Sequence, residues 1–210
     1  MGATISSFFA NIFKGKKTKI LILGLDASGK TTLLYRLKTG KDVGVVPTIG
    51  FNVETVQIGD LKIEVWEVGG GDKIHALWCH YYADMSAIVY LVDSTDPQRF
   101  GYLKELIEKG SKDPLLEKLP VMLLANKQDL KGCLTPQEVA ERLEFPRIFP
   151  NKIWKEFGIV GKDGIGLIEA FTWLGKAIEE SKKRPVASSA NTNAAPVLPV
   201  IEIDPAAKNK

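Results

Sequence analysis

The sequence predicts an α/β fold whose sheet is mainly parallel, and three observations lead to this prediction. Apolar runs of strand length alternate with amphipathic, helix-forming segments along most of the 210-residue chain. A glycine-rich loop at residues 24–31 lies between the first such run and the first helix-forming segment. Two strand-like runs, at residues 51–58 and 61–68, are joined by Gly59 and Asp60, a pairing typical of a hairpin, which adds one antiparallel strand.

Each element follows from a local pattern, in chain order. Short apolar runs rich in β-branched residues predict strands at residues 20–23, 51–58, 61–68, 87–92, 121–125 and 153–160. Helical periodicity predicts helices at residues 32–38, 100–109 and 167–183. A further helix is expected to begin at Thr135, because Thr as N-cap, Pro136 in the first position and Glu138 in the third form a capping box.

The composition bounds the class of protein. A chain of 210 residues with 45% apolar residues is long enough for one domain with a full hydrophobic core. The net charge of +3 is too small to indicate nucleic acid as a partner. Two widely separated cysteines, Cys79 and Cys133, fit a reducing, cytosolic compartment. No apolar run approaches the roughly 18 residues that a membrane span needs.

Residues 1–18 form a segment with its own pattern. Five apolar side chains fall on one face of a helix: Ile5, Phe8, Phe9, Ile12 and Phe13. Lysines follow at positions 14, 16, 17 and 19, and Gly2 lies in a pattern typical of N-myristoylation. One myristoyl chain binds membranes only marginally, so the apolar face and the lysines would supply the second contribution. We therefore expect an amphipathic membrane helix at residues 1–18 that attaches reversibly through myristoylated Gly2. The alternative is a helix docked permanently on the domain.

The end of the chain differs sharply from the folded domain that we expect at residues 19–183. Residues 184–210 contain four Pro and six Ala, no aromatic residue, and neither helical nor strand periodicity. This composition predicts a flexible Pro/Ala-rich tail, whose role the sequence does not indicate.

The most informative stretch is residues 24–31, which we call the phosphate loop. It consists of Gly24, Leu25, Asp26, Ala27, Ser28, Gly29, Lys30 and Thr31, and Thr32 continues into the predicted helix. In the order strand, loop, helix, this pattern surrounds phosphate oxygens with backbone N–H groups. Lys30 would add a positive charge at the β- and γ-phosphates, and the Thr31 hydroxyl would be a ligand for Mg²⁺. The alternative is a glycine turn that binds nothing.

A second polar stretch, which we call the base loop, selects the nucleotide. It is Asn126-Lys127-Gln128-Asp129, directly after a predicted strand. The Asp129 carboxylate can accept from both the ring N–H and the exocyclic amino group of guanine, a pair that adenine lacks. The stem of Lys127 would cover the base, and Asn126 would tie loops together. The carboxyl ends of parallel strands meet at one edge of a sheet, where ligands bind. The alternative is a solvated polar loop.

Four segments together resemble the ADP-ribosylation factor (Arf) and Arf-like branch of the small GTPases. They are the phosphate loop with Thr32, residues 47–56, residues 66–82 and the base loop. The similarity runs through residues 2–182. It implies an α/β, three-layer P-loop small GTPase fold with a mainly parallel six-stranded sheet and one antiparallel hairpin strand. It also implies GTP, GDP and Mg²⁺ as ligands, a monomer, and an exchange factor, an activating protein and effectors as partners.

The resemblance implies roles for further positions. Thr48 would join Thr31 on Mg²⁺, and the N–H of Gly70 would meet the γ-phosphate. Val160 and Gly161 align with the family's base-contact loop, where the Gly161 N–H would donate to the guanine carbonyl oxygen. Effectors would be recognised by an aromatic triad, whose other role would be packing: Phe51, Trp66 and Tyr81. In the family, the hairpin slides when GTP binds and expels the N-terminal helix, which couples nucleotide state to membrane attachment.

Two residues depart from the family's Trp-Asp-x-Gly-Gly-Gln motif, at residues 66–71. Gly71 replaces the Gln that orients the attacking water, so we expect hydrolysis to be slower by orders of magnitude. Glu67 replaces an Asp that meets Mg²⁺ through water. Its extra methylene displaces the carboxylate by about 1.5 Å, which would weaken Mg²⁺ binding.

These features predict a GTP-binding switch that acts at membrane surfaces in vesicle trafficking. It would be cytoplasmic, reversibly attached to endomembranes such as the Golgi, and impaired in hydrolysis. The alternative is a non-hydrolysing, GTP-bound scaffold that recruits effectors. A third hypothesis, a P-loop phosphotransferase acting on a small molecule, is weakened by the base loop and by the absence of a lid-like arginine cluster.

Overall fold

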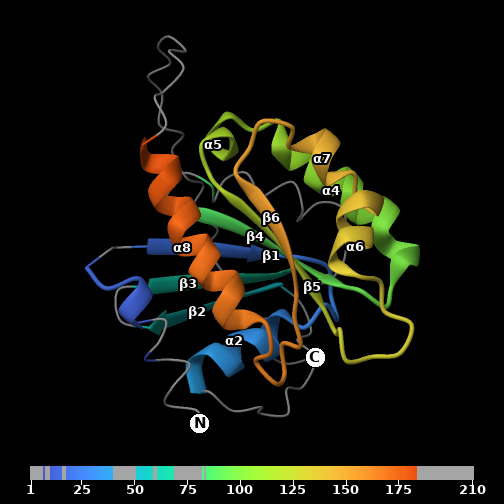
Figure 1. The fold of residues 1–210 in the computed structure, drawn as a ribbon, viewed down its shortest axis with the longest axis horizontal. Helices are drawn as coiled ribbons and strands as arrows, with labels where there is room; N and C mark the ends of the chain where they lie inside the picture. The colour runs from blue at the N-terminus through green and yellow to red at the C-terminus, as the bar shows by residue number, and fades with distance from the viewer. Residues whose placement is uncertain are drawn as a thin grey trace, which may run out of the picture.

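The computed structural model describes residues 7, 10–15, 18–39, 51–58, 61–68, 82 and 84–183, with only the backbone for most of residues 51–68. Its strands form one six-stranded sheet in the order β2-β3-β1-β4-β5-β6 (Figure 1). The strands are β1 (Thr18–Leu23), β2 (Phe51–Ile58), β3 (Leu61–Val68), β4 (Ala87–Asp93), β5 (Val121–Asn126) and β6 (Trp154–Gly158). The prediction of an α/β fold with a six-stranded sheet is confirmed.

The register of the sheet follows the expected pattern. β2 and β3 are antiparallel, with Phe51 opposite Val68 and Ile58 opposite Leu61, as a short hairpin requires. The other four pairings are parallel: β1 with β3, β1 with β4, β4 with β5, and β5 with β6. The carboxyl ends of β1, β4 and β5 therefore lie along one edge, where Leu23, Asp93 and Asn126 end their strands.

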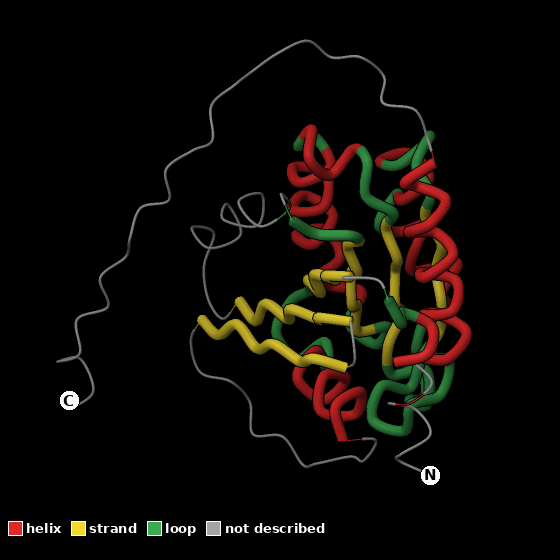
Figure 2. Tube along the Cα trace, turned by 90° about the vertical axis from the view of Figure 1, so that its left-hand side faces the viewer, coloured by secondary structure: helices red, strands yellow, loops and turns green. Residues whose placement is uncertain are grey.

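Helices cover both faces of the sheet and make three layers (Figures 1 and 2). They are α2 (Lys30–Thr39), α4 (Phe100–Ser111), α5 (Pro114–Glu117), α6 (Pro136–Arg142), α7 (Phe145–Ile148) and α8 (Leu167–Lys183), with a short 3₁₀ turn, η2 (Pro97–Arg99). One core lies between the sheet and α2 with α8, and includes Leu33 and Phe171. The other lies under α4 to α7, and includes Leu103 and Phe145.

Local sequence explains where several helices begin. Thr135 caps α6: its hydroxyl accepts from the Glu138 N–H, and the Glu138 carboxylate accepts from the Thr135 N–H, so the predicted capping box is present. Asp113 caps α5 by accepting from the Leu115 N–H. The sequence pattern did not predict the four-residue helices α5 and α7, because neither is long enough to show a helical period.

The N-terminal segment contacts the last helix. Residues 10–12 are helical, and Phe13 is buried in the core beneath α8. A Cβ on Gly175 of α8 would lie 2.9 Å from Ile12 Cγ2, so this glycine permits the close approach. The predicted face at Ile5, Phe8 and Phe9 lies outside the described residues. Within the described part of the chain, no helix combines the length and apolar character needed to cross a membrane.

Candidate nucleotide-binding site

The phosphate loop connects the end of β1 to the start of α2. Two glycines permit close contacts that a side chain would prevent. A Cβ on Gly24 would lie 2.2 Å from the Leu91 carbonyl oxygen of β4. Gly29 has a φ of +95°, and its Cβ would lie 2.5 Å from Nδ2 of Asn126. The loop therefore passes close to the strand ends, as a backbone cradle for an anion must.

Lys30 begins α2, and its side chain folds back over the loop. The residue is 2% exposed, and its Nζ donates to the carbonyl oxygens of Gly24 at 2.9 Å and Leu25 at 2.7 Å. Both of these acceptors are neutral carbonyl oxygens, and they hold the ammonium group at the loop. Thr31 is 8% exposed beside it, and Thr32 is half-buried in the first turn of α2.

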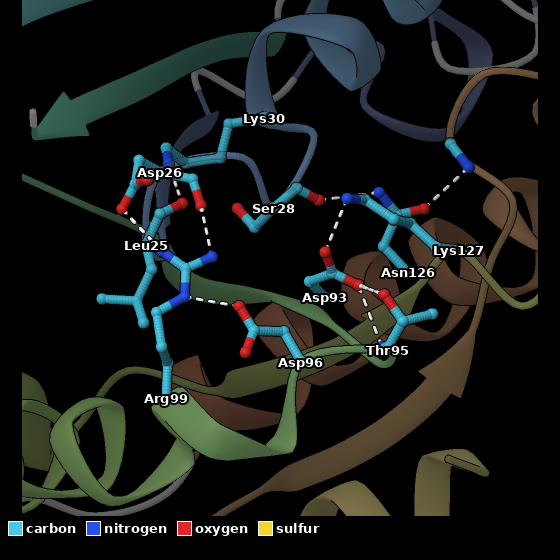
Figure 3. A network of polar contacts seen from close by, with 11 residues as sticks. Leu25, Asp26, Ser28, Lys30, Asp93, Thr95, Asp96, Arg99, Asn126 and Lys127 are labelled. Carbon is cyan, nitrogen blue, oxygen red and sulfur yellow. Dashed lines mark hydrogen bonds and ion pairs between the residues drawn. The ribbon is translucent and has the colours of Figure 1, made fainter. Parts of the chain in front are cut away.

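Asn126 joins the phosphate loop to the base loop. Its Nδ2 donates to the Ser28 carbonyl oxygen at 2.8 Å, although 98 positions separate the two residues (Figure 3). Its Oδ1 accepts from the backbone N–H of Gly161 at 2.9 Å. The expected role of Asn126 in tying loops together is therefore present. The Gly161 N–H, expected to meet the guanine oxygen, donates to Asn126, so guanine would have to share or replace that bond.

Asp93, at the end of β4, orients Lys127. Its carboxylate accepts from Lys127 Nζ at 2.5 Å and from the backbone N–H and hydroxyl of Thr95 at 2.9 and 2.7 Å (Figure 3). Burial alone would raise the pKa of Asp93, but the hydrogen bonds from Lys127 and Thr95 outweigh it, and the pKa is lowered. Lys127 has a left-handed φ of 68°, which helps turn the base loop away from β5.

Asp129 lies at the outer end of the base loop, where its carboxylate is partly exposed. Lys162 Nζ donates to Asp129 Oδ2 at 2.6 Å, and this hydrogen bond lowers the pKa of the Asp129 carboxyl. Asp129 is therefore an ionised acceptor, as guanine recognition requires. Val160 precedes the Gly161 turn and is held by a bridge to Ile165. Asp129 and Lys162 are 33 positions apart in the sequence, and the fold brings Asp129 beside the Gly161 turn.

Sequence reasoning missed two basic side chains that complete the site. Lys162 pairs with Asp129, and Arg99, the last residue of η2, contacts Asp26 of the phosphate loop at 2.8 Å. Neither belongs to a recognised motif. The sequence signal that could have identified them is their position: each follows the end of a strand, at the same edge of the sheet as both loops.

Several predicted residues lie outside the described part of the chain: Gly2, Thr48, Gly70, Gly71 and Tyr81. For Phe51, Trp66 and Glu67 the structure gives the backbone in the hairpin, where Trp66 is opposite Val53 and Glu67 opposite Asn52. The hairpin strands therefore bring Phe51 and Trp66 into one sheet, without defining the aromatic triad.

The described residues of the site fit a nucleotide that is bound together with Mg²⁺. The described residues include no group of three His, Cys, Asp or Glu side chains suited to a metal ion. A Mg²⁺ bound beside phosphates needs few protein ligands, because phosphate oxygens and water fill most of its octahedron. The Thr31 hydroxyl, next to the buried charge of Lys30, fits that arrangement.

Comparisons with known proteins agree with this geometry. The model of the ADP-ribosylation factor family matches residues 5–178. ADP-ribosylation factor 3 of Arabidopsis thaliana and ADP-ribosylation factor 1 of Brassica rapa subsp. pekinensis are each 41% identical over 179 residues, covering 85% of this chain and 98% of theirs. The Arl6 BBS3 small GTPase of Trypanosoma brucei, solved with the nucleotide analogue GppNp, is similar at 30% identity and a TM-score of 0.68, over 79% of this chain and 99% of its own. The chain therefore belongs to the ADP-ribosylation factor family of small GTPases.

Proposed function

We propose that this protein is a GTP-dependent switch that acts at membrane surfaces in vesicle trafficking and hydrolyses GTP slowly. It binds GTP and GDP with Mg²⁺ through residues 19–183. It attaches to endomembranes, such as the Golgi, through residues 1–18 and myristoylated Gly2. Residues 184–210 form a flexible tail of unassigned role. An exchange factor, an activating protein and effectors are the expected partners of a monomeric protein.

The proposal that the protein binds guanine nucleotide rests on the hydrogen bonds of Asn126 with both Ser28 and Gly161. It connects the loop that would hold the phosphates to the residues that would hold the base. GTP should therefore displace a fluorescent GDP from the Mg²⁺-loaded protein at low concentration, and ATP should not. Displacement by ATP at similar concentrations would instead favour a phosphotransferase.

Slow hydrolysis is proposed from the sequence, because Gly71 has no side chain to orient the attacking water. Replacing it with the family's residue, Gly71→Gln, should raise the rate of single-turnover GTP hydrolysis by at least tenfold. Gly101→Gln is a matched control, because Gly101 lies in α4 with open space around its Cβ position. Equal rates for the parent and Gly71→Gln would mean that another group positions the water.

The same measurement separates the switch from the scaffold. A switch hydrolyses GTP measurably when purified alone or with an activating protein. A scaffold keeps its GTP under both conditions and co-purifies with it. We favour the switch because Lys30 and Thr31, which lie in the described site, retain the residue types that phosphoryl transfer needs.

Reversible attachment is proposed from Gly2 and the apolar face of residues 5–13. In support, Phe13 is buried and Ile12 packs against Gly175 of α8, so part of the face is covered by the domain. Release of this contact would expose the face to lipid. Flotation of the myristoylated protein with anionic liposomes should be stronger in the GTP state than in the GDP state. Equal flotation in the two states would mean that membrane attachment does not depend on the bound nucleotide.

A further inference from the structure

Arg99 holds the phosphate loop from the side opposite to Asn126. Its Nη1 donates to Asp26 Oδ1 at 2.8 Å and its Nη2 to the Asp26 carbonyl oxygen at 3.1 Å, across 73 positions of sequence (Figure 3). Its Nε donates to Asp96 Oδ2 at 2.5 Å. All three nitrogens of the guanidinium are therefore used, in the fork geometry that lysine cannot reproduce.

Asp96 and the turn after β4 fix the direction in which Arg99 points. The Asp96 N–H donates to the Asp93 carbonyl oxygen at 3.3 Å, and the Arg99 N–H donates to the Asp96 carbonyl oxygen at 3.4 Å. Asp93 is also the residue that orients Lys127. One short turn therefore serves the base loop on one side and the phosphate loop on the other.

Packing on this side of the loop leaves a gap. A small pocket of about 10 Å³, open to solvent, lies under the loop and is lined in part by Leu25, Ser28, Asp96, Arg99 and Phe100. The Ser28 hydroxyl oxygen is buried and has no hydrogen-bond partner among the described residues. Beside such a cavity, the position of Asp26 depends on polar contacts, and Arg99 supplies those that reach both its carboxylate and its backbone.

The charge of Asp26 matters because the residue belongs to the phosphate loop. Its side chain is 72% exposed, so without a partner it would be free to turn toward the site. A carboxylate near the phosphates repels them, and GTP carries one more phosphate than GDP. An unpaired Asp26 would therefore weaken GTP binding more than GDP binding.

We propose that Arg99 is a positioning residue that pairs with Asp26 and thereby sets the preference of the phosphate loop for nucleoside triphosphate over diphosphate. The contact to the Asp26 carbonyl fixes the loop backbone, and the contact to the carboxylate cancels its charge. This extends the proposed function, since it takes guanine nucleotide binding as given.

The test measures affinities of the full-length, Mg²⁺-loaded protein for GDP and for a non-hydrolysable GTP analogue. Arg99→Ala should lower the ratio of triphosphate to diphosphate affinity by about tenfold, the effect of one nearby, partly screened charge. Adding Asp26→Asn to Arg99→Ala should restore the ratio, because the repelling charge is gone. Arg99→Lys should keep most of the ratio while both nucleotides dissociate faster, because the charge remains and the fork is lost.

Arg147→Ala is the matched control, because Arg147 of α7 pairs with Glu108 and Glu144, not with either loop. It should leave the ratio unchanged. An unchanged ratio in Arg99→Ala, or a lowered ratio that Asp26→Asn does not restore, would overturn the proposal. Failure of the parent protein to bind either nucleotide would instead overturn the proposed function. A loss of folding in Arg99→Ala would show as a lower melting temperature and equal losses for both nucleotides, which also contradicts a selective role.

Discussion

The amide nitrogen of Asn126 lies 2.8 Å from the carbonyl oxygen of Ser28, so the residue that begins the base loop also holds the phosphate loop. Asn126 is 4% exposed, and both of its partners are backbone groups in buried positions. The two halves of the nucleotide site therefore cannot move independently while this side chain is in place.

Removing the amide should loosen both loops together. Asn126→Ala leaves the Ser28 carbonyl and the Gly161 N–H without their partner, at a cost of about 1–3 kcal/mol for each buried group. We expect GDP dissociation to accelerate at least tenfold, and the melting temperature to fall. Release of a fluorescent GDP measures this, with Asn151→Ala as a control on an exposed loop. Equal release rates would show that the loops hold their positions without Asn126.

A methyl group at Gly29 should abolish nucleotide binding. The φ of +95° is unfavourable for alanine, and the new Cβ would lie 2.5 Å from Asn126 Nδ2. Gly132→Ala is a matched control, because Gly132 has a φ of +83° with open space around it. Both variants should lose about 1–2 kcal/mol of stability from backbone strain. Only Gly29→Ala should lose affinity for GDP by calorimetry. Similar affinities in the two variants would contradict the close approach of the loop to Asn126.

Asp129 should determine which base is bound. Asp129→Asn removes a charged acceptor that contributes about 1.5–3 kcal/mol for each hydrogen bond, so GTP affinity should fall about a hundredfold or more. The new amide can donate to the carbonyl oxygen that xanthine has in place of the guanine amino group, so xanthosine triphosphate should bind the variant better than GTP. Competition between the two nucleotides measures the change. Asp163→Asn, at an exposed position two residues after Gly161, should change neither affinity.

Asp93 should make the free energy of unfolding depend on pH in the acidic range. Its folded pKa is lowered, since hydrogen bonds from Lys127 and Thr95 outweigh burial. The carboxylate therefore stabilises the fold at any pH above its unfolded pKa of about 3.9, and this contribution is lost as the pH falls through the lower folded pKa. The difference in unfolding free energy between the parent and Asp93→Asn should be constant from pH 7 to 5 and shrink below about pH 4. Urea unfolding at each pH measures it. A difference that shrinks already between pH 7 and 5 would mean that another group is responsible.

Much of the fold could be predicted because its elements carry local patterns. The apolar runs at β4 and β5 are buried at every position, and the hairpin bounds matched at Phe51–Ile58 and Leu61–Val68. The short helix α7 was missed, because its start depends on Glu144 in a left-handed conformation and on packing of Phe145 against Phe149 and Trp154. Neither cause can be recognised in a four-residue stretch.

The candidate site also has a part that the sequence predicts and a part that only the fold reveals. The phosphate loop and the base loop are contiguous motifs, and their residue types state their chemistry. The partners Arg99 and Lys162 are single side chains that become relevant only when β4, β5 and β6 are placed side by side. Their role depends on the order of strands in the sheet, which a short pattern does not contain.

The contact between Ile12 and Gly175 brings the N-terminal segment beside the last helix, which makes a circular permutant of the chain feasible. The last helix ends at Lys183, about 12 Å beyond Gly175 at the rise of an α-helix, so a short linker can join the two ends of the domain. New ends can then be opened beside Gly132, where the backbone has room. Such a circular permutant would keep the strands and both loops but would have no free amino-terminal glycine to acylate, and would thus separate nucleotide binding from the proposed lipid modification.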